Sequence, residues 1–356
     1  MKKVEIMNPS IHINLTKYHH NLLYLSNMLK QQGITSMVVT KVFCADQRLI
    51  DVINSTDIKY VADSRIKNFI GMKTSKTKVL LRIPHLSEVC EVIKYTDISL
   101  NSEVEVIKNL NDEAKKQNKK HRIILMFDIG DLREGIYYKS EYLPMIEQII
   151  ELKHIELLGI GTNLTCYGGV IPTKETLDKL EMIKHQIEET FFIHLDVISG
   201  GNSSSIKLIE EHQIPSFINN LRIGEAFVLG RETAYGKHID QMFDDVFTLK
   251  AEIIELKDKP SLPEGILGFD AFGKKVSFKD QGEMTRAILG IGRQDIQCED
   301  LVCPKNIKIL GCSSDHLILQ VKKGQYALGD LITFKLTYGG ILSLTTSPYV
   351  RRVYES

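Results

Sequence analysis

Short apolar runs, rich in β-branched residues, recur at regular intervals through the first two thirds of the chain. Between them the apolar positions shift to spacings of three and four, which predicts helices such as Leu15 to Gln32, Glu103 to Gln117, Glu141 to Leu152 and Lys174 to Glu188. The eight predicted strands are Ser36 to Val42, Ile58 to Val61, Val79 to Ile83, Asp97 to Leu100, Arg122 to Phe127, Glu156 to Ile160, Ile193 to Ile198 and Asn220 to Ile223. Eight strands that alternate with helices predict an α/β fold, a (β/α)8 TIM-type barrel.

The pattern changes near residue 240, where the helical spacing disappears. Strand-like runs separated by glycine take over, namely Phe247 to Leu256, Ala287 to Gly292, Ile307 to Gly311, Leu317 to Val321 and Leu331 to Leu336. We therefore predict a barrel over residues 1–238 and a C-terminal all-β domain over residues 239–356. Residues 1–12 are a candidate partner strand for that second domain.

Charge and hydrophobicity argue against nucleic-acid and membrane partners. Hydrophobic residues make up 43% of the chain, and 45 basic residues balance 45 acidic ones, so no net charge attracts nucleic acid or anionic lipid. No run reaches the roughly 20 apolar residues of a membrane helix, and no secretory signal is recognisable. We therefore expect a cytoplasmic protein without a nucleic-acid or membrane partner. The cysteines show neither a CxxC pair nor zinc-site spacing and are expected to be free thiols: Cys44, Cys90, Cys166, Cys298, Cys303 and Cys312.

The active site of a TIM-type barrel lies at the C-terminal ends of its strands, so unusual residues there carry most weight. Lys41 stands at the end of the first predicted strand, flanked by apolar residues. Burial favours the neutral amine, which is the form that attacks an aldehyde. A structural lysine that only extends toward solvent is the alternative.

Two further strand ends offer groups for a substrate. Arg133 follows the fifth strand, and its guanidinium suits a carboxylate; a rim salt bridge with Asp131 or Glu134 is the alternative. Asn163 follows the sixth strand and supplies a planar amide, although an asparagine at such a place is more often a loop cap than a catalytic residue.

The seventh and eighth strand ends suit a phosphate. The turn with Asn202 and Ser203 opens a helix, and Gly224 follows Arg222 at the eighth strand end. A serine-rich helix cap without a ligand is the alternative. A lysine on one side of the ring and a phosphate turn on the other side are the two anchors that pyridoxal phosphate needs.

These residues resemble the alanine racemase-like, fold-type III family of pyridoxal-phosphate enzymes, and the resemblance spans nearly the whole chain. It implies that Lys41 forms a Schiff base with the cofactor and that Arg133 binds the substrate carboxylate. It also implies that Arg222 faces the pyridine nitrogen, which favours racemisation over transamination. The remaining cofactor contacts that it implies are Asn163, Asn202, Ser203, Gly224 and Tyr354.

The chain departs from the family pattern at two places. The family's tyrosine base, which the partner subunit donates, corresponds to Phe272 here, so we consider Asp270, Cys312 and Asp315 as catalytic groups instead. The family's Tyr-Gly-His-Gly stretch after the lysine is replaced by Val42 to Asp46, which removes one phosphate contact. Gly311 to His316 also resembles the ornithine decarboxylase loop whose aspartate contacts a distal amine, so Asp315 would bind the side chain of a basic amino acid.

The resemblance implies an amino-acid racemase that works as a head-to-tail homodimer with shared active sites. The runs Asn163 to Gly169 and Ser199 to Ser203 are similar to those of family members that racemise ornithine, so ornithine is the expected substrate, with lysine and alanine as alternatives. A basic amino-acid decarboxylase of the same fold, a pyridoxal-phosphate carrier and a barrel without the cofactor are the competing interpretations.

Overall fold

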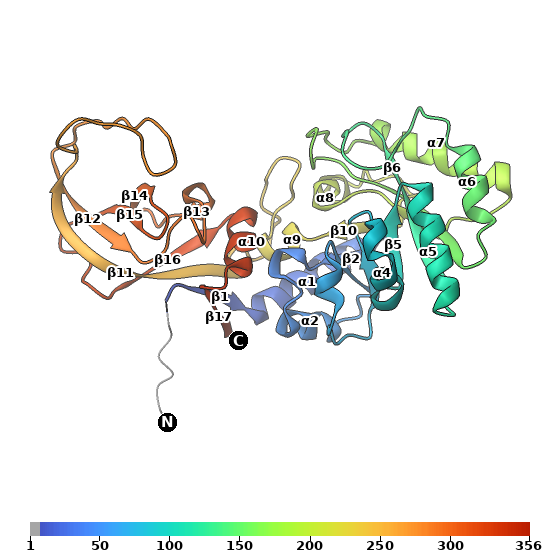
Figure 1. Cartoon of the computed structure of the whole chain (residues 1–356), viewed down its shortest axis with the longest axis horizontal. Helices are drawn as coiled ribbons and strands as arrows, with labels where there is room; N and C mark the ends of the chain where they lie inside the picture. The colour runs from blue at the N-terminus through green and yellow to red at the C-terminus, as the bar shows by residue number, and fades with distance from the viewer. Residues whose placement is uncertain (1–7) are drawn as a thin grey trace, which may run out of the picture. The chain divides into compact units, whose positions relative to one another are not determined.

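The computed structural model describes residues 8–356, which form two compact units. One unit is Lys17–Asp244, and the other combines residues 8–16 with Asp245–Ser356. Each unit has its own sheet (Figure 1).

The first unit is a closed barrel of parallel strands. Following the ring, the strands are β2 (Thr35–Val39), β3 (Tyr60–Asp63), β4 (Thr77–Leu80), β5 (Ile98–Asn101), β6 (His121–Asp128), β8 (Ile155–Thr162), β9 (Val197–Ser199) and β10 (Asn220–Ile223). The ring closes where β10 pairs with β2, which places Arg222 opposite Met37. The predicted (β/α)8 barrel is therefore confirmed.

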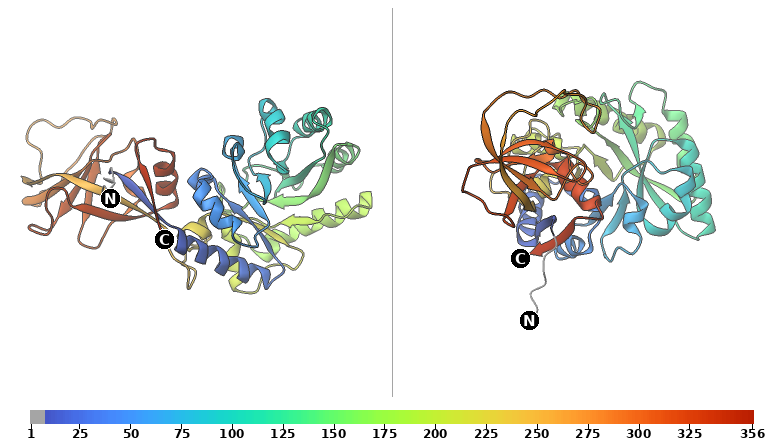
Figure 2. Two further views of the ribbon diagram at one scale, coloured as in Figure 1. Left: turned by 90° about the horizontal axis from the view of Figure 1, so that it is seen from below. Right: turned by 60° about the vertical axis from the view of Figure 1, so that its left-hand side comes forward.

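Helices connect the strands and lie on the outside of the barrel (Figure 2). They are α1 (Leu15–Lys30), α2 (Gln47–Asn54), α3 (Ile66–Phe69), α4 (Val89–Tyr95), α5 (Val104–Lys116), α6 (Leu143–Ile150), α7 (Lys174–Phe191), α8 (Ile206–Glu210) and α9 (Glu225–Leu229). A two-residue strand, β7 (Ile136–Tyr137), adds to β6 beside the barrel. Both faces of each barrel strand are thus covered, which explains why the strands appear in the sequence as continuous apolar runs.

Alternate residues of the barrel strands fill its interior. Met37 and Val39, Ile98 and Leu100, and Ile124 and Met126 belong to one buried apolar cluster, as the two-residue period of a strand requires. Between β8 and β9 the backbones approach so closely that a Cβ on Gly159 would lie 1.9 Å from the carbonyl oxygen of Val197. Only glycine fits there.

The first barrel strand ends earlier than the sequence predicts. It stops at Val39, not Val42, and Lys41 begins the short 3-10 helix η1 (Lys41–Phe43). Thr40 has left the extended conformation (φ −101°, ψ −4°), and its carbonyl accepts hydrogen bonds from the amides of Phe43 and Ala45. The chain therefore turns away from the sheet one residue before the lysine.

The second unit is a curled, mostly antiparallel sheet. Its strands are β1 (Ser10–Asn14), β11 (Phe247–Pro260), β12 (Glu283–Leu289), β13 (Leu301–Val302), β14 (Lys308–Cys312), β15 (Leu317–Val321), β16 (Leu331–Leu336) and β17 (Arg351–Glu355). β1 pairs antiparallel with β11 and parallel with β17. The unit also contains helix α10 (Tyr338–Thr346), which the expectation of an all-β domain missed. Its start is capped by the side chain of Thr337, which accepts a hydrogen bond from the Gly340 amide.

The expectation that all six cysteines are free thiols is wrong for two of them. Cys298 and Cys312 form a disulfide with a Cα–Cα distance of 6.6 Å, so these two are not free thiols, whereas Cys44, Cys90, Cys166 and Cys303 are. The two partners are 14 residues apart in the sequence and meet because η4 (Cys298–Asp300) lies beside the end of β14. Within residues 8–356, no helix is long and apolar enough to cross a membrane, and no cluster of side chains could hold a metal ion.

The close approach of β8 and β9 generates a stability prediction. Gly159→Ala should lower the free energy of unfolding by about 3 kcal/mol, because two paired strands would have to separate to admit one methyl group. Urea unfolding followed by circular dichroism at the helical minimum measures this loss. Gly268→Ala is the control, since nothing lies within 4 Å of a Cβ at that position. Equal stability of the two variants would contradict the packing argument.

Candidate active site

Arg222 is a buried cation at the C-terminal end of the barrel. It lies on β10, and only 3% of its surface is exposed. Its guanidinium donates to the Ser199 hydroxyl at 2.5 Å, to the Thr162 carbonyl at 2.5 Å and to Asn163 Oδ1 at 3.0 Å. Burial lowers the pKa of Arg222 to about 10, so the side chain remains protonated at neutral pH. Acceptors from β8, the loop after it and β9 thus surround one cation.

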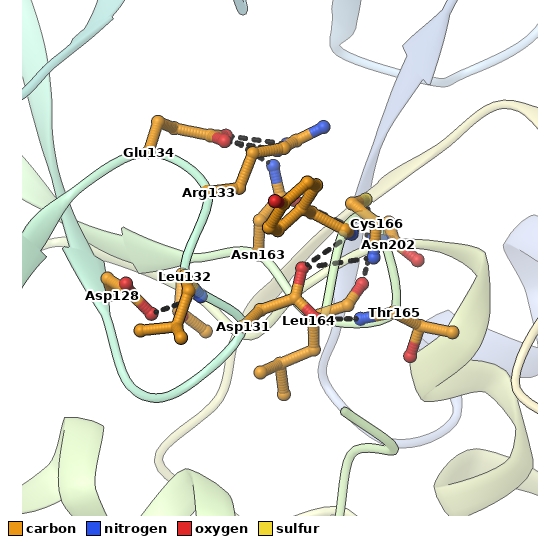
Figure 3. A network of polar contacts seen from close by, with 12 residues as sticks. Asp128, Asp131, Leu132, Arg133, Glu134, Asn163, Leu164, Thr165, Cys166 and Asn202 are labelled. Carbon is orange, nitrogen blue, oxygen red and sulfur yellow. Dashed lines mark hydrogen bonds and ion pairs between the residues drawn. The ribbon is translucent and has the colours of Figure 1, made fainter. Parts of the chain in front are cut away.

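Asn163 connects this cation to the loop after β6. Its Oδ1 accepts from Arg222. Its Oδ1 also accepts from Asn202 Nδ2 at 3.3 Å, and its Nδ2 donates to Glu134 Oε1 at 2.7 Å (Figure 3). The amide orientation follows from these partners, because only the oxygen can accept from the guanidinium. Asn163 therefore joins three loops at the barrel mouth.

Arg133 forms an ion pair with Glu134. Its Nη2 donates to Glu134 Oε1 at 2.6 Å, and its Nε contacts Oε2. Burial alone would raise the pKa of Glu134, but the hydrogen bonds from Arg133 and Asn163 and the nearby charge of Arg222 more than offset this effect and lower it. The salt bridge considered as an alternative for Arg133 is therefore present, and Glu134 belongs to the same network as Arg222.

Asp131 organises the loop after β8. Its carboxylate is buried and accepts four backbone N–H groups, from Thr165 at 3.0 Å, Val170 at 3.1 Å, Cys166 at 3.1 Å and Tyr167 at 2.9 Å. The sequence indicated Asp131 only as an alternative salt-bridge partner of Arg133. Its amide partners lie 34 to 39 residues further along the chain, and no local signal in the sequence marks them.

The turn after β9 and the start of α9 meet. Ser203 Oγ accepts from the Ala226 amide at 3.3 Å, and Gly224, the cap of α9, would contact the Val39 side chain at 3.1 Å if it carried a Cβ. Asn202 shapes this turn, because its Oδ1 accepts from the Ser204 amide at 2.8 Å and its Nδ2 donates to the Leu164 carbonyl at 2.9 Å. Asn202 therefore caps the short helix that follows it, and its place among the cofactor contacts stays a prediction.

A buried hydroxyl in the same turn has no partner among the described residues. Ser204 is 1% exposed, and its Oγ makes no hydrogen bond within residues 8–356. Gly201, at φ +119°, brings the backbone so close to Ser205 Oγ that a Cβ would lie 2.6 Å from it. An unpaired buried hydroxyl beside a glycine turn fits a small anionic group such as a phosphate.

Lys41 lies beside these residues rather than across from them. β2 and β10 are neighbours in the ring, with Val38 opposite Ile223, so Lys41 and Gly224 follow the ends of adjacent strands. The expectation that the phosphate turn lies on the other side of the ring is wrong, because closure makes the first and eighth strands neighbours. Lys41 is half-buried, and its amine has no hydrogen bond or ion pair with any of residues 8–356.

The other predicted residues lie in the C-terminal unit. Asp270 closes a turn by accepting from the amides of Lys274 at 2.8 Å and Phe272 at 2.9 Å, which lowers its pKa. Asp315 is exposed, and its hydrogen bond with His316 at 2.8 Å lowers its pKa. Tyr354 lies on β17 opposite Ile13. The disulfide leaves Cys312 without a thiol proton, so Cys312 is withdrawn as a candidate acid or base.

Comparisons with known proteins identify the family of this chain. The family model "Alanine racemase, N-terminal domain" matches residues 13–232. A curated ornithine racemase of Acetoanaerobium sticklandii is 46% identical over 350 residues, covering 97% of this chain and 99% of the relative. A curated lysine racemase of Thermotoga maritima is 38% identical over 352 residues, covering 98% of each chain.

Solved structures share the fold. The alanine racemase of Clostridium difficile 630 superposes with a TM-score of 0.74 at 18% identity, covering 99% of this chain and 97% of that one. The alanine racemase of Streptomyces coelicolor A3(2) gives 0.76 at 14% identity, covering 97% of both chains. Because the family model covers most of the barrel and the two curated relatives align along nearly the whole sequence, the chain belongs to the alanine racemase family.

Proposed function

We propose that the chain is an amino-acid racemase that uses pyridoxal phosphate and acts on ornithine. The observation that carries this proposal is that Lys41, whose amine makes no hydrogen bond or ion pair within residues 8–356, follows the strand next to the one that carries Arg222. The Ser203–Ser204 turn follows the next strand of the ring. The identity to the curated ornithine racemase supports the substrate, and the lysine racemase supports a basic amino acid in general.

The residues of the site fit the cofactor. Lys41 would attach it, Ser203, Ser204 and Gly224 would hold its phosphate, and Arg222 would face the ring nitrogen. The phosphate contact expected of Tyr354 stays a prediction. When bound, pyridoxal phosphate withdraws the electron pair that remains on the α-carbon after its proton leaves. Asn163 and Asn202 support the site by holding Arg222 and the phosphate turn.

Arg222 favours racemisation over other outcomes. A guanidinium only donates hydrogen bonds, and with a pKa of about 10 it keeps its proton at neutral pH. Facing the ring nitrogen, it would supply no proton there, and an unprotonated ring would delocalise the electron pair of the α-carbon less. This would favour return of a proton to that carbon, which is racemisation.

Racemisation needs an acid or base on each face of the substrate. Lys41 Nζ serves one face, and Arg133 holds the substrate carboxylate. For the second face, Asp270 and Asp315 remain as candidates from the C-terminal unit of a partner subunit. We therefore propose a head-to-tail homodimer with shared sites, in which Asp315 also contacts the distal amine of ornithine. A cytoplasmic location remains a prediction, and cell fractionation would measure it.

The primary test is conversion of free amino acids by the purified enzyme. L-Ornithine should become a mixture of both enantiomers, with lysine and alanine converted more slowly, as chiral chromatography measures. Lys41→Ala should reduce the rate about 100- to 10 000-fold, because it removes the acid–base group of one face, and it should abolish the visible absorbance of the lysine-bound cofactor. Lys115→Ala, on the exposed end of α5, is the control. An amine product without enantiomer exchange would instead indicate a decarboxylase.

The role of Arg222 is tested by product partition. Arg222→Glu should slow racemisation about 100-fold, since it replaces a preorganised donor, and should raise the share of turnovers that end in keto-acid by-products. Mass spectrometry of the products measures this share, and the visible absorbance verifies that the cofactor is still bound. An unchanged product ratio would remove Arg222 from the assigned position.

The shared site is tested by mixing two defective variants. Asp315→Ala should raise the KM for ornithine about 10-fold, through loss of one charge pair, and leave the KM for alanine nearly unchanged. In an equimolar mixture with Lys41→Ala, about a quarter of the sites should combine an intact Lys41 with an intact Asp315 of the other subunit. Steady-state kinetics should then show a component with the wild-type KM. A mixture with only the raised KM would contradict the shared site.

A further inference from the structure

Glu134 joins the two arginines of the site. Its Oε1 accepts from Arg133 Nη2 at 2.6 Å and from Asn163 Nδ2 at 2.7 Å, and its Oε2 contacts Arg133 Nε. Asn163 in turn accepts from Arg222 at 3.0 Å. One carboxylate therefore contacts Arg133 directly (Figure 3) and is linked to Arg222 through the side-chain amide of Asn163.

The backbone around Glu134 is held firmly. Asp128 Oδ1 accepts from the amides of Gly130 at 2.8 Å and Leu132 at 3.1 Å. Gly135 has φ +117°, and a Cβ on it would lie 2.6 Å from the Asp128 amide nitrogen, so the loop packs directly against the end of β6. The backbone from which the Glu134 side chain extends is therefore held in place.

Arg133, by contrast, has no such anchor of its own. Its side chain is 38% exposed, against 22% for Glu134, and it follows Leu132, which is in the left-handed region at φ +57°. An arginine side chain with several free torsions loses much entropy when a ligand must order it. Two contacts from Glu134 restrict the guanidinium beforehand and leave its remaining N–H groups for another acceptor.

We propose that Glu134 is a positioning residue that holds Arg133 ready for the substrate α-carboxylate and couples it to the Asn163–Arg222 pair. The proposal rests on the role of Arg133 in the proposed function. The ligand contact belongs to Arg133, and Glu134 acts through it. The carboxylate also prevents two cationic side chains from facing each other without a counter-charge.

The test compares two probes that differ in the carboxylate. 5-Aminopentanoate is ornithine without its α-amine, and 1,4-diaminobutane is ornithine without its carboxylate. Glu134→Gln should weaken binding of 5-aminopentanoate to the holoenzyme about 3- to 10-fold, because Arg133 must then be ordered by the ligand. Binding of 1,4-diaminobutane should change less than about 2-fold. Isothermal titration calorimetry measures both dissociation constants, and equal losses for the two probes would overturn the proposal.

A double-mutant cycle separates positioning from general destabilisation. In an Arg133→Ala background, Glu134→Gln should cause no further loss of 5-aminopentanoate binding, since the group on which it acts is gone. The same loss in both backgrounds would refute the role. Glu134→Asp keeps the charge and should recover part of the affinity, and it also serves if the glutamine variant fails to fold.

Glu188→Gln is the matched control. Glu188 is likewise a mostly buried carboxylate in an ion pair, with Lys184 at 2.5 Å on α7, and it accepts the Leu195 amide at 3.0 Å. Its loss should leave both dissociation constants unchanged. If the wild type racemises no amino acid, the proposed function fails, whereas the calorimetric comparison still decides the role of Glu134.

Discussion

The buried guanidinium of Arg222 is the constraint on which the barrel mouth depends. Removing such a charge from water costs several kcal/mol unless acceptors replace the lost hydration. Ser199, Thr162 and Asn163 supply those acceptors from β9, the end of β8 and the loop that follows it, so these segments must keep their positions relative to β10. The carboxylate of Glu134 offsets the charge of Arg222 and is linked to it through Asn163. A single cation thereby fixes the relative positions of several loops.

Closure of the sheet decides which groups can act together. All eight strands are parallel, so their C-terminal ends meet on one side, and the pairing of β10 with β2 makes the first and last strands neighbours. Lys41 and the glycine turn of Gly224 are far apart in the sequence but follow adjacent strand ends. The turn of the chain at Thr40 then takes Lys41 out of the sheet, and among residues 8–356 its amine has no hydrogen-bond or ion-pair partner.

In the C-terminal unit too, loops that are distant in the sequence contact one another. The backbone N–H of Arg293 donates a hydrogen bond to the Ser313 carbonyl at 2.9 Å. The guanidinium of Arg293 lies 4.1 Å from the centre of the Phe272 ring. A Cβ on Gly292 would lie 2.4 Å from the Asp315 amide nitrogen, so only glycine allows this approach. The loops that contain Phe272 and Asp315 thus both lie beside the segment of Gly292 and Arg293, although Phe272 and Asp315 are 43 positions apart in the sequence.

The sequence by itself determined the barrel, because eight apolar runs alternating with helical periods leave few other ways to bury both faces of each strand. It also determined which strand ends carry Lys41, Arg133, Asn163 and Arg222, since strand ends can be located from the apolar pattern. Only the tertiary structure decided the partners of these residues. Three contacts show this: the hydrogen bonds from four backbone amides to Asp131, the hydrogen bond between Glu134 and Asn163, and the Cys298–Cys312 disulfide. Each joins segments that no periodic pattern in the sequence relates to one another. Such contacts depend on how each of the two sheets brings distant loops together, and the residue pattern within one segment does not predict them.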